Sequence, residues 1–145
     1  FYFENNNISL IDDDVLDLFE NLRINGIKIA LNTGYSRQMQ HKIIKHFDLV
    51  NYVDDFISSE EVRHGRPFPY MIHRIMERNH ILNVKNVAKI GDTLNDIKEG
   101  RNAGCGLNIG VLSGKENKDR LSGYADIVID KITDIKNDDL PVFLL

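Results

Sequence analysis

The 145-residue sequence has a single cysteine, Cys105, three prolines and no tryptophan. With one thiol the chain cannot form an internal disulfide bond, and a zinc site built on several thiolates is excluded. Disulfide-free chains are typical of reducing compartments, so we expect a cytoplasmic protein. Cys105 follows a predicted helix and precedes an apolar strand, and we therefore expect it to be a buried structural thiol.

The sequence also lacks long apolar runs and an excess of basic residues. No run approaches the roughly 20 apolar residues that cross a bilayer, so a membrane is not an expected partner. The net charge is −4 and the pI about 5.7, whereas nucleic-acid-binding surfaces are usually basic. With 42% hydrophobic and 28% charged residues, the composition is typical of a folded globular domain. We expect residues 1–145 to form one domain that binds no nucleic acid.

Apolar residues alternate along the chain between the spacing of helices and that of strands. Helices are predicted at residues 12–25, 36–47, from 67 through 76, and 96–103, and strands at 27–32, 56–58, 87–90, 107–112 and 126–129. Strands separated by segments of helix length are typical of a parallel sheet covered by helices on both faces. We therefore predict an α/β, Rossmann-like fold, in which ligands bind at the carboxyl ends of the strands.

Polar residues gather where the predicted strands end. Thr33 and Gly34 follow the first strand, Arg66 precedes a helix, and Asp92 follows the strand at 87–90, with Asp96 four residues later. Taken singly, Thr33 and Gly34 suit a turn, and Arg66 suits a solvated cation in a loop. Asp92 suits a helix cap, and Asp96 suits an acid in the first turn of a helix. A pair of carboxylates at a strand end also suits Mg²⁺, a hard ion that binds a few carboxylates together with water and phosphate. The pair therefore favours a magnesium site at this edge of the sheet.

Three segments resemble, in order and spacing, three signature motifs of the haloacid dehalogenase superfamily. KIGDTLNDIKEGRNAGC (89–105) is similar to the fourth motif, LNTGYS (31–36) to the second and HGRPFPYMI (64–72) to the third. The resemblance extends from about residue 13 to residue 140. The GRPxPxM pattern is similar to that of phosphonoacetaldehyde hydrolases and their phosphonatase-like relatives.

The resemblance implies a Mg²⁺-dependent hydrolase of a small phosphate ester or phosphonate that acts through an aspartyl-phosphate intermediate. By the same resemblance, the Thr33 hydroxyl and the Gly34 amide would bind phosphoryl oxygens. Arg66, where many relatives have lysine, would stabilise negative charge. Asp92 would bind the metal, and Asp96 would bind it through a water or orient the basic residue. The implied catalytic residues are Thr33, Arg66 and Asp96, and the implied metal ligands are Asp92 and Asp96.

The first motif of the family, which carries the nucleophilic aspartate, has no counterpart in this sequence. Asp12–Asp14 follows no apolar strand and begins a predicted helix. Because the chain begins with Phe1 and shows no signal peptide, we expect the nucleophile strand and a cap domain upstream. In the family that strand lies between the strands predicted at 27–32 and 87–90. Without it we expect unpaired inner edges, a poorly stable fragment and no activity from this chain alone.

The sequence also allows other functions. The chain could be part of phosphonoacetaldehyde hydrolase itself. A lysine in the upstream cap, placed to form a Schiff base with the substrate, would identify that enzyme. The missing first motif favours a catalytically inactive fragment or interaction module. A phosphate-accepting regulatory domain would need an acidic pair after the first strand, where this chain has Thr33 and Gly34. The presence of Thr33, Arg66, Asp92 and Asp96 together favours the hydrolase.

Overall fold

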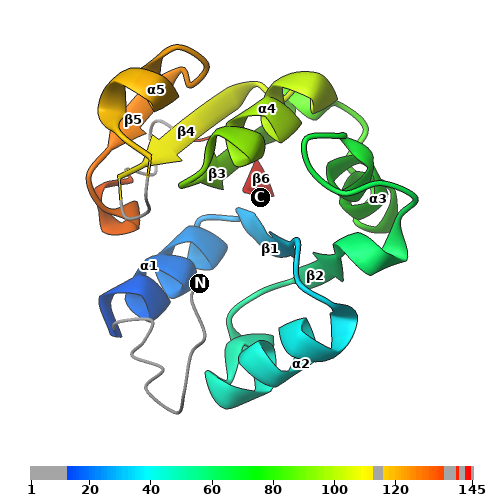
Figure 1. Cartoon of the computed structure of the whole chain (residues 1–145). Coiled ribbons are helices and arrows are strands. Elements are labelled where there is room, and N and C mark those ends of the chain that lie inside the picture. The colour runs from blue at the N-terminus through cyan, green and yellow to red at the C-terminus, as the bar shows by residue number, and fades with distance from the viewer. Residues whose placement is uncertain (1–12, 113–115, 136–139, 141–142, 145) are drawn as a thin grey trace.

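The computed structural model describes residues 13–112, 116–135, 140 and 143–144 (Figure 1). The helices are α1 (Asp13–Ile24), α2 (Arg37–His46), α3 (Tyr70–Arg78), α4 (Leu94–Ala103) and α5 (Lys118–Ser122). The strands are β1 (Lys28–Thr33), β2 (Asp55–Ser58), β3 (Val87–Gly91), β4 (Leu107–Val111), β5 (Ile127–Ile129) and β6 (Phe143–Leu144). Short 3₁₀ turns lie at η1 (Leu49–Asn51), η2 (Ser59–Glu61), η3 (Val84–Asn86) and η4 (Ile132–Asp134). No described helix has the length and apolar character needed to span a membrane.

The strands form one sheet in the order β2-β1-β6-β3-β4-β5, and all of the pairings are parallel. Figure 1 shows α1 and α2 on one side of the sheet and α3 and α4 on the other, with α5 beside α4. This arrangement confirms the predicted α/β class. Because the strands are parallel, the residues that follow β1, β2 and β3 all lie at the same edge of the sheet.

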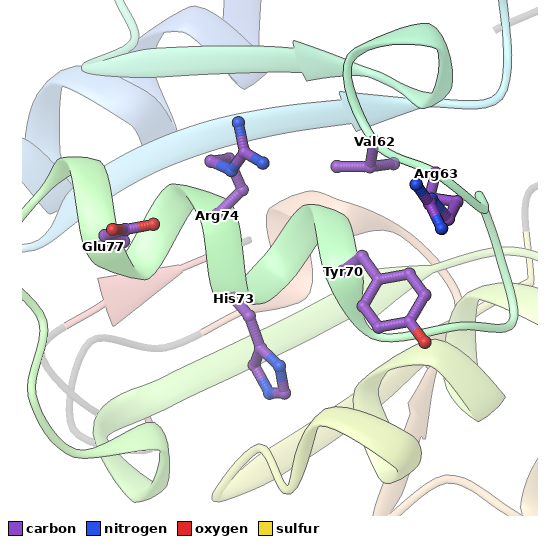
Figure 2. A pocket seen from close by; sticks show the side chains of 6 residues that line it. All are labelled: Val62, Arg63, Tyr70, His73, Arg74 and Glu77. Atoms are coloured by element: carbon purple, nitrogen blue, oxygen red, sulfur yellow. The ribbon is translucent and has the colours of Figure 1, made fainter.

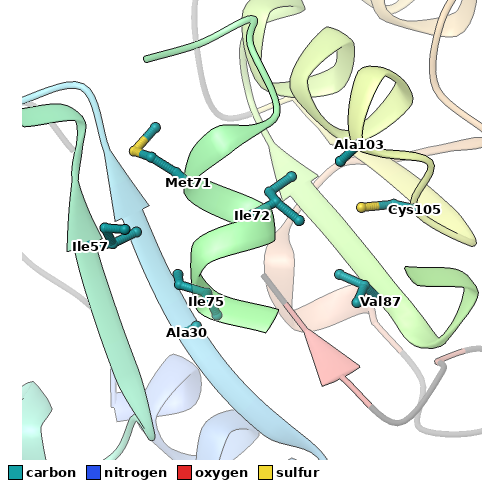
Figure 3. Packing of buried hydrophobic residues seen from close by; sticks show 8 residues of the cluster. All are labelled: Ala30, Ile57, Met71, Ile72, Ile75, Val87, Ala103 and Cys105. Atoms are coloured by element: carbon teal, nitrogen blue, oxygen red, sulfur yellow. The ribbon is translucent and has the colours of Figure 1, made fainter. Parts of the chain in front are cut away.

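Alternate residues of the strands pack into two cores. On one face, Met71, Ile72 and Ile75 of α3 pack against residues of β1, β2 and β3, together with the buried Cys105 (Figure 3). On the other face, Phe19 and Leu22 of α1 form the second core with strand residues that include Ile29 and Ala88. Helices α1 and α3 thus each bury one face against the sheet, and the predicted burial of Cys105 is confirmed.

Two predicted helix starts differ from the structure. Helix α3 begins at Tyr70 and not at Pro67, because the amide of Phe68 donates to the carbonyl of Gly65 and closes a turn over residues 65–68. Helix α4 begins at Leu94 and not at Asp96. Its N-cap is Thr93, whose hydroxyl accepts a hydrogen bond from the backbone amide of Asp96.

The inner edges of β1 and β3 are partly paired, contrary to our expectation. The backbone of β6 lies between them, with Phe143 paired to Lys28 and Val87, and Leu144 paired to Ile29 and Ala88. This pairing covers only the first two residues of each strand. Toward their carboxyl ends, no strand of the described chain lies between Ala30–Thr33 and Lys89–Gly91.

Candidate active site

A cluster of charged side chains fills the space beside the carboxyl ends of β1 and β3. Asp96 and Glu99 come from α4, Lys89 from β3 and Arg66 from the loop before α3. Asn32, near the end of β1, joins the cluster through hydrogen bonds. The cluster holds two cations and two carboxylates, so its charges balance in a region of low water access.

Asp96 is buried, and both of its carboxylate oxygens have partners. Its Oδ1 lies 2.5 Å from Nη1 of Arg66 and 3.9 Å from Nζ of Lys89. Its Oδ2 accepts from the Thr93 hydroxyl at 2.8 Å and from the Thr93 amide at 3.1 Å. Burial raises the pKa of Asp96, but Lys89, Arg66 and the hydrogen bonds from Thr93 together hold that pKa below its usual range. Asp96 is thus an ionised group that joins the Thr93 helix cap to Arg66.

Arg66 reaches the sheet from an irregular segment, and its side chain is 20% exposed. Besides its contact with Asp96, Nη2 donates to the backbone carbonyl of Asn32 at 3.0 Å. Its Nε lies 3.7 Å from Oε1 of Glu99 and has no hydrogen-bond acceptor among the described residues. The guanidinium is therefore positioned at the strand ends with part of its donor capacity unused.

Lys89 and Glu99 belong to this cluster, and our sequence analysis did not identify them. Lys89 is 2% exposed and Glu99 is fully buried. Nζ of Lys89 lies 3.0 Å from Oε1 of Glu99 and donates to Oδ1 of Asn32 at 2.7 Å. The amide of Asn32 in turn donates to Oε1 of Glu99 at 2.8 Å. A lysine within the apolar strand VAKI was the signal available in the sequence, because strands covered on both faces are usually apolar throughout.

Asp92 follows β3 directly and is half-buried. Because Thr93 caps α4, Asp92 does not have the capping role that was its simplest interpretation. Across the described ranges, no hydrogen bond or ion pair holds its carboxylate. Asp92 is therefore an acid at the edge of the sheet whose oxygens remain available to a ligand.

Thr33 ends β1, on the other side of the strand gap. Its Oγ1 accepts from the amide of Tyr35 at 3.1 Å, which leaves the hydroxyl proton to donate. Gly34 is exposed, and a Cβ atom added there would meet nothing within 4 Å. The structure thus brings Arg66 into contact with Asp96. Thr33, Gly34 and Asp92 lie at the same edge, and no hydrogen bond or ion pair among the described residues joins Asp92 to Thr33 or Gly34.

A separate pocket of about 390 Å³ lies along α3 and the segment before it (Figure 2). Its lining residues are Val62, Arg63, Tyr70, His73, Arg74 and Glu77. None of the predicted site residues contributes to it. The charged cluster at the strand ends, and not this pocket, is the candidate active site.

A family model described as haloacid dehalogenase-like hydrolase matches residues 2–104, and thus most of the chain. The chain belongs to the haloacid dehalogenase-like hydrolase family. It is 38% identical over 103 residues to a phosphonoacetaldehyde hydrolase of Bacillus cereus, a match that covers 70% of this chain and 39% of the relative. The chain therefore spans about two fifths of the length of that curated relative.

Solved structures of the haloacid dehalogenase-like family have the same fold. A phosphonoacetaldehyde hydrolase-like protein from Oleispira antarctica superposes with a TM-score of 0.76 at 25% identity, over 90% of this chain and 55% of that protein. A haloacid dehalogenase-superfamily hydrolase from Ehrlichia chaffeensis gives 0.75 at 25% identity, over 93% and 60% of the two chains. The architecture deduced from the strand order is thus the architecture of this family.

The oxygen donors of this family member suit part of a magnesium site. Within residues 13–112, 116–135, 140 and 143–144, no group of three His, Cys, Asp or Glu side chains converges as metal ligands. Mg²⁺ commonly binds through one or two carboxylates together with substrate phosphate and water. Asp92 offers one such carboxylate, whereas the oxygens of Asp96 already contact Arg66 and Thr93.

Proposed function

We propose that this chain supplies the phosphate-binding and metal-binding part of a Mg²⁺-dependent hydrolase active site. Its substrate would be a small phosphate ester or phosphonate. The observation that carries the proposal is the contact of 2.5 Å between Arg66 and the buried Asp96 at the carboxyl ends of the strands. This contact holds a guanidinium at the edge of the sheet where β1 and β3 end, which is where ligands bind in parallel α/β sheets.

Each residue has a definite part in the proposal. The hydroxyl of Thr33 and the amide of Gly34 donate hydrogen bonds to phosphoryl oxygens, and the planar guanidinium of Arg66 binds a further oxygen. Donors positioned in advance stabilise the charge that develops during phosphoryl transfer. Before substrate binds, Asp96 orients Arg66 through their direct contact.

Asp92 is the proposed magnesium ligand, because its carboxylate is available and lies at the end of β3. Bound Mg²⁺ would neutralise charge on the phosphoryl group and so make attack by a carboxylate easier. The attacking aspartate, with its cap domain, would come from a segment that precedes residue 1 in the intact protein, consistent with the match to only 39% of the relative's length. That segment is the proposed partner of this chain, and the single buried thiol of Cys105 fits a cytoplasmic location.

Phosphonoacetaldehyde hydrolase activity is a second candidate, favoured by the 38% identity to the Bacillus cereus enzyme. The two activities differ in the bond that breaks, which is P–O in a phosphate ester and C–P in the phosphonate. The residues described here bind the phosphoryl group in either case. A substrate comparison therefore decides between them.

The test uses the intact protein that contains residues 1–145. Phosphate release from p-nitrophenyl phosphate and from phosphonoacetaldehyde is measured with and without Mg²⁺, and acetaldehyde is measured as the second product of C–P cleavage. We expect Mg²⁺-dependent turnover that Arg66→Met lowers by about 100-fold or more, while the exposed control Arg74→Met has no effect. An intact protein with no turnover of either substrate would contradict the hydrolase and favour the inactive interaction module.

A further inference from the structure

We infer that Lys89 is a positioning residue, which neutralises Glu99 and thereby leaves Arg66 free to exchange Asp96 for an oxygen of an anionic substrate. The inference rests on the proposed function, because it explains how a guanidinium already paired with protein carboxylates becomes available to a phosphoryl group. It concerns two buried residues, Lys89 and Glu99, that the proposed mechanism itself does not use.

The two cations of the cluster share the same two carboxylates. Oε1 of Glu99 lies 3.0 Å from Lys89 and 3.7 Å from Arg66. Oδ1 of Asp96 shows the opposite order, with Arg66 at 2.5 Å and Lys89 at 3.9 Å. Each carboxylate therefore has one near and one more distant cation. If Arg66 leaves, Lys89 still lies within ion-pair distance of both acids.

Lys89 is the stationary cation of this pair. It lies within β3, is 2% exposed, and is held by Asn32 as well as by Glu99. Helix α4 covers it closely, since a Cβ atom on Gly100 would lie 2.7 Å from the Cβ of Lys89. The ammonium is thus buried under α4 and has its partners within the cluster.

Arg66 has the features of the cation that moves. It extends from a turn rather than from a helix or strand. Its side chain is 20% exposed, whereas that of Lys89 is 2% exposed. Its Nε has no hydrogen-bond acceptor among the described residues. A buried carboxylate left without a cation is strongly unfavourable. Without Lys89, Arg66 would be the only cation of the described residues paired with Asp96 and Glu99, and both acids would retain it.

The test compares Lys89→Met, Glu99→Gln and the double variant in the intact protein. Inorganic phosphate is the probe, titrated in the presence of Mg²⁺, and the Nε–H signal of Arg66 is followed by NMR. We expect Lys89→Met to weaken phosphate binding by about tenfold or more, since a charge-assisted hydrogen bond is lost. The double variant should recover to within about threefold of wild type, because it lacks one cation and one carboxylate, so that Arg66 and Asp96 again balance each other. Lys45→Met, an exposed lysine of α2, is the control.

A purely structural role of Lys89 predicts a different pattern. The double variant would then bind phosphate as weakly as Lys89→Met, and this result, or an unchanged Lys89→Met, would overturn the inference. If Lys89→Met does not fold, the Glu99→Gln variant tests the inference instead. The inference requires this variant to bind phosphate at least as tightly as wild type, and weaker binding would overturn it. Wild-type protein that neither binds phosphate nor turns over substrate would refute the proposed function, and the inference with it. An active wild type with an unaffected Lys89→Met refutes the inference alone.

Discussion

Gly91 and Asp96 approach each other so closely that a Cβ atom on Gly91 would lie 2.1 Å from the Cβ of Asp96. The absence of a side chain at the end of β3 therefore allows the first turn of α4 to lie directly over the strand. Asp92 and Asp96 owe their relative placement to this close approach, since one follows the strand and the other lies in that turn.

Gly91→Ala should destabilise the fold, because the added methyl group must displace the Asp96 side chain at the start of α4. Overpacking of this kind costs about 1–3 kcal/mol, and we expect that decrease in the free energy of unfolding measured with urea. Gly34→Ala is the matched control, since a Cβ atom there meets nothing within 4 Å. Equal stability of the two variants would show that α4 can move away from β3 at little cost.

Asp92→Asn should abolish Mg²⁺ binding while changing the free energy of unfolding by less than about 0.5 kcal/mol. The reason is that no described hydrogen bond or ion pair holds the Asp92 carboxylate, so the fold does not depend on it. Isothermal titration with Mg²⁺ and urea unfolding measure the two effects. Asp130→Asn removes an exposed acid that follows β5 and should leave both quantities unchanged.

Asp96→Asn should lower stability at neutral pH and remove part of its dependence on acid pH. The folded-state pKa of Asp96 lies below its usual range, so this group stabilises the fold above the unfolded pKa of about 3.9 and loses that contribution as the pH falls through the folded pKa. The stability difference between wild type and variant should therefore shrink below about pH 4. Urea unfolding in steps from pH 7 to pH 3 measures this difference, and a gap that stays constant would mean that Asp96 is not held ionised.

The thiol of Cys105 should be unreactive in the folded protein. Burial raises its pKa to about 12, so almost no thiolate is present near neutral pH. We expect alkylation by iodoacetamide at pH 8 to be at least about 100-fold slower in the folded protein than in denaturing urea. Rapid labelling of the folded protein would show that the core between α3 and α4 opens readily.

Much of the fold follows from local features of the sequence. Gly26 and Gly104 adopt positive φ angles of 81° and 87° at the ends of α1 and α4, a conformation that favours glycine at helix ends. The helix starts that were predicted wrongly depend on hydrogen bonds between nearby residues rather than on the spacing of apolar residues. Thr93 and Asp96 bond to each other reciprocally and begin α4 earlier, while a turn at residues 65–68 delays α3.

The strand between β1 and β3 is the largest difference between the expected and the observed sheet topology. The resemblance placed a strand from outside the chain there, whereas Phe143 and Leu144 occupy its amino-terminal part. Nothing in the local pattern of a two-residue segment specifies its neighbours. Strand pairing between segments more than 50 residues apart depends on the assembled sheet.

For the candidate site, the sequence by itself determined which chemistry is available. Thr33, Gly34, Arg66, Asp92 and Asp96 were identified from strand ends and motif spacing, because parallel strands bring their carboxyl ends to one edge. Only the tertiary structure decided how the charges pair. Lys89 and Glu99 are ten residues apart on a strand and a helix, and their contact exists because α4 packs on β3 and excludes water from both. Removal from water makes the pairing of each charge obligatory, and sequence spacing alone does not reveal which buried charges will meet.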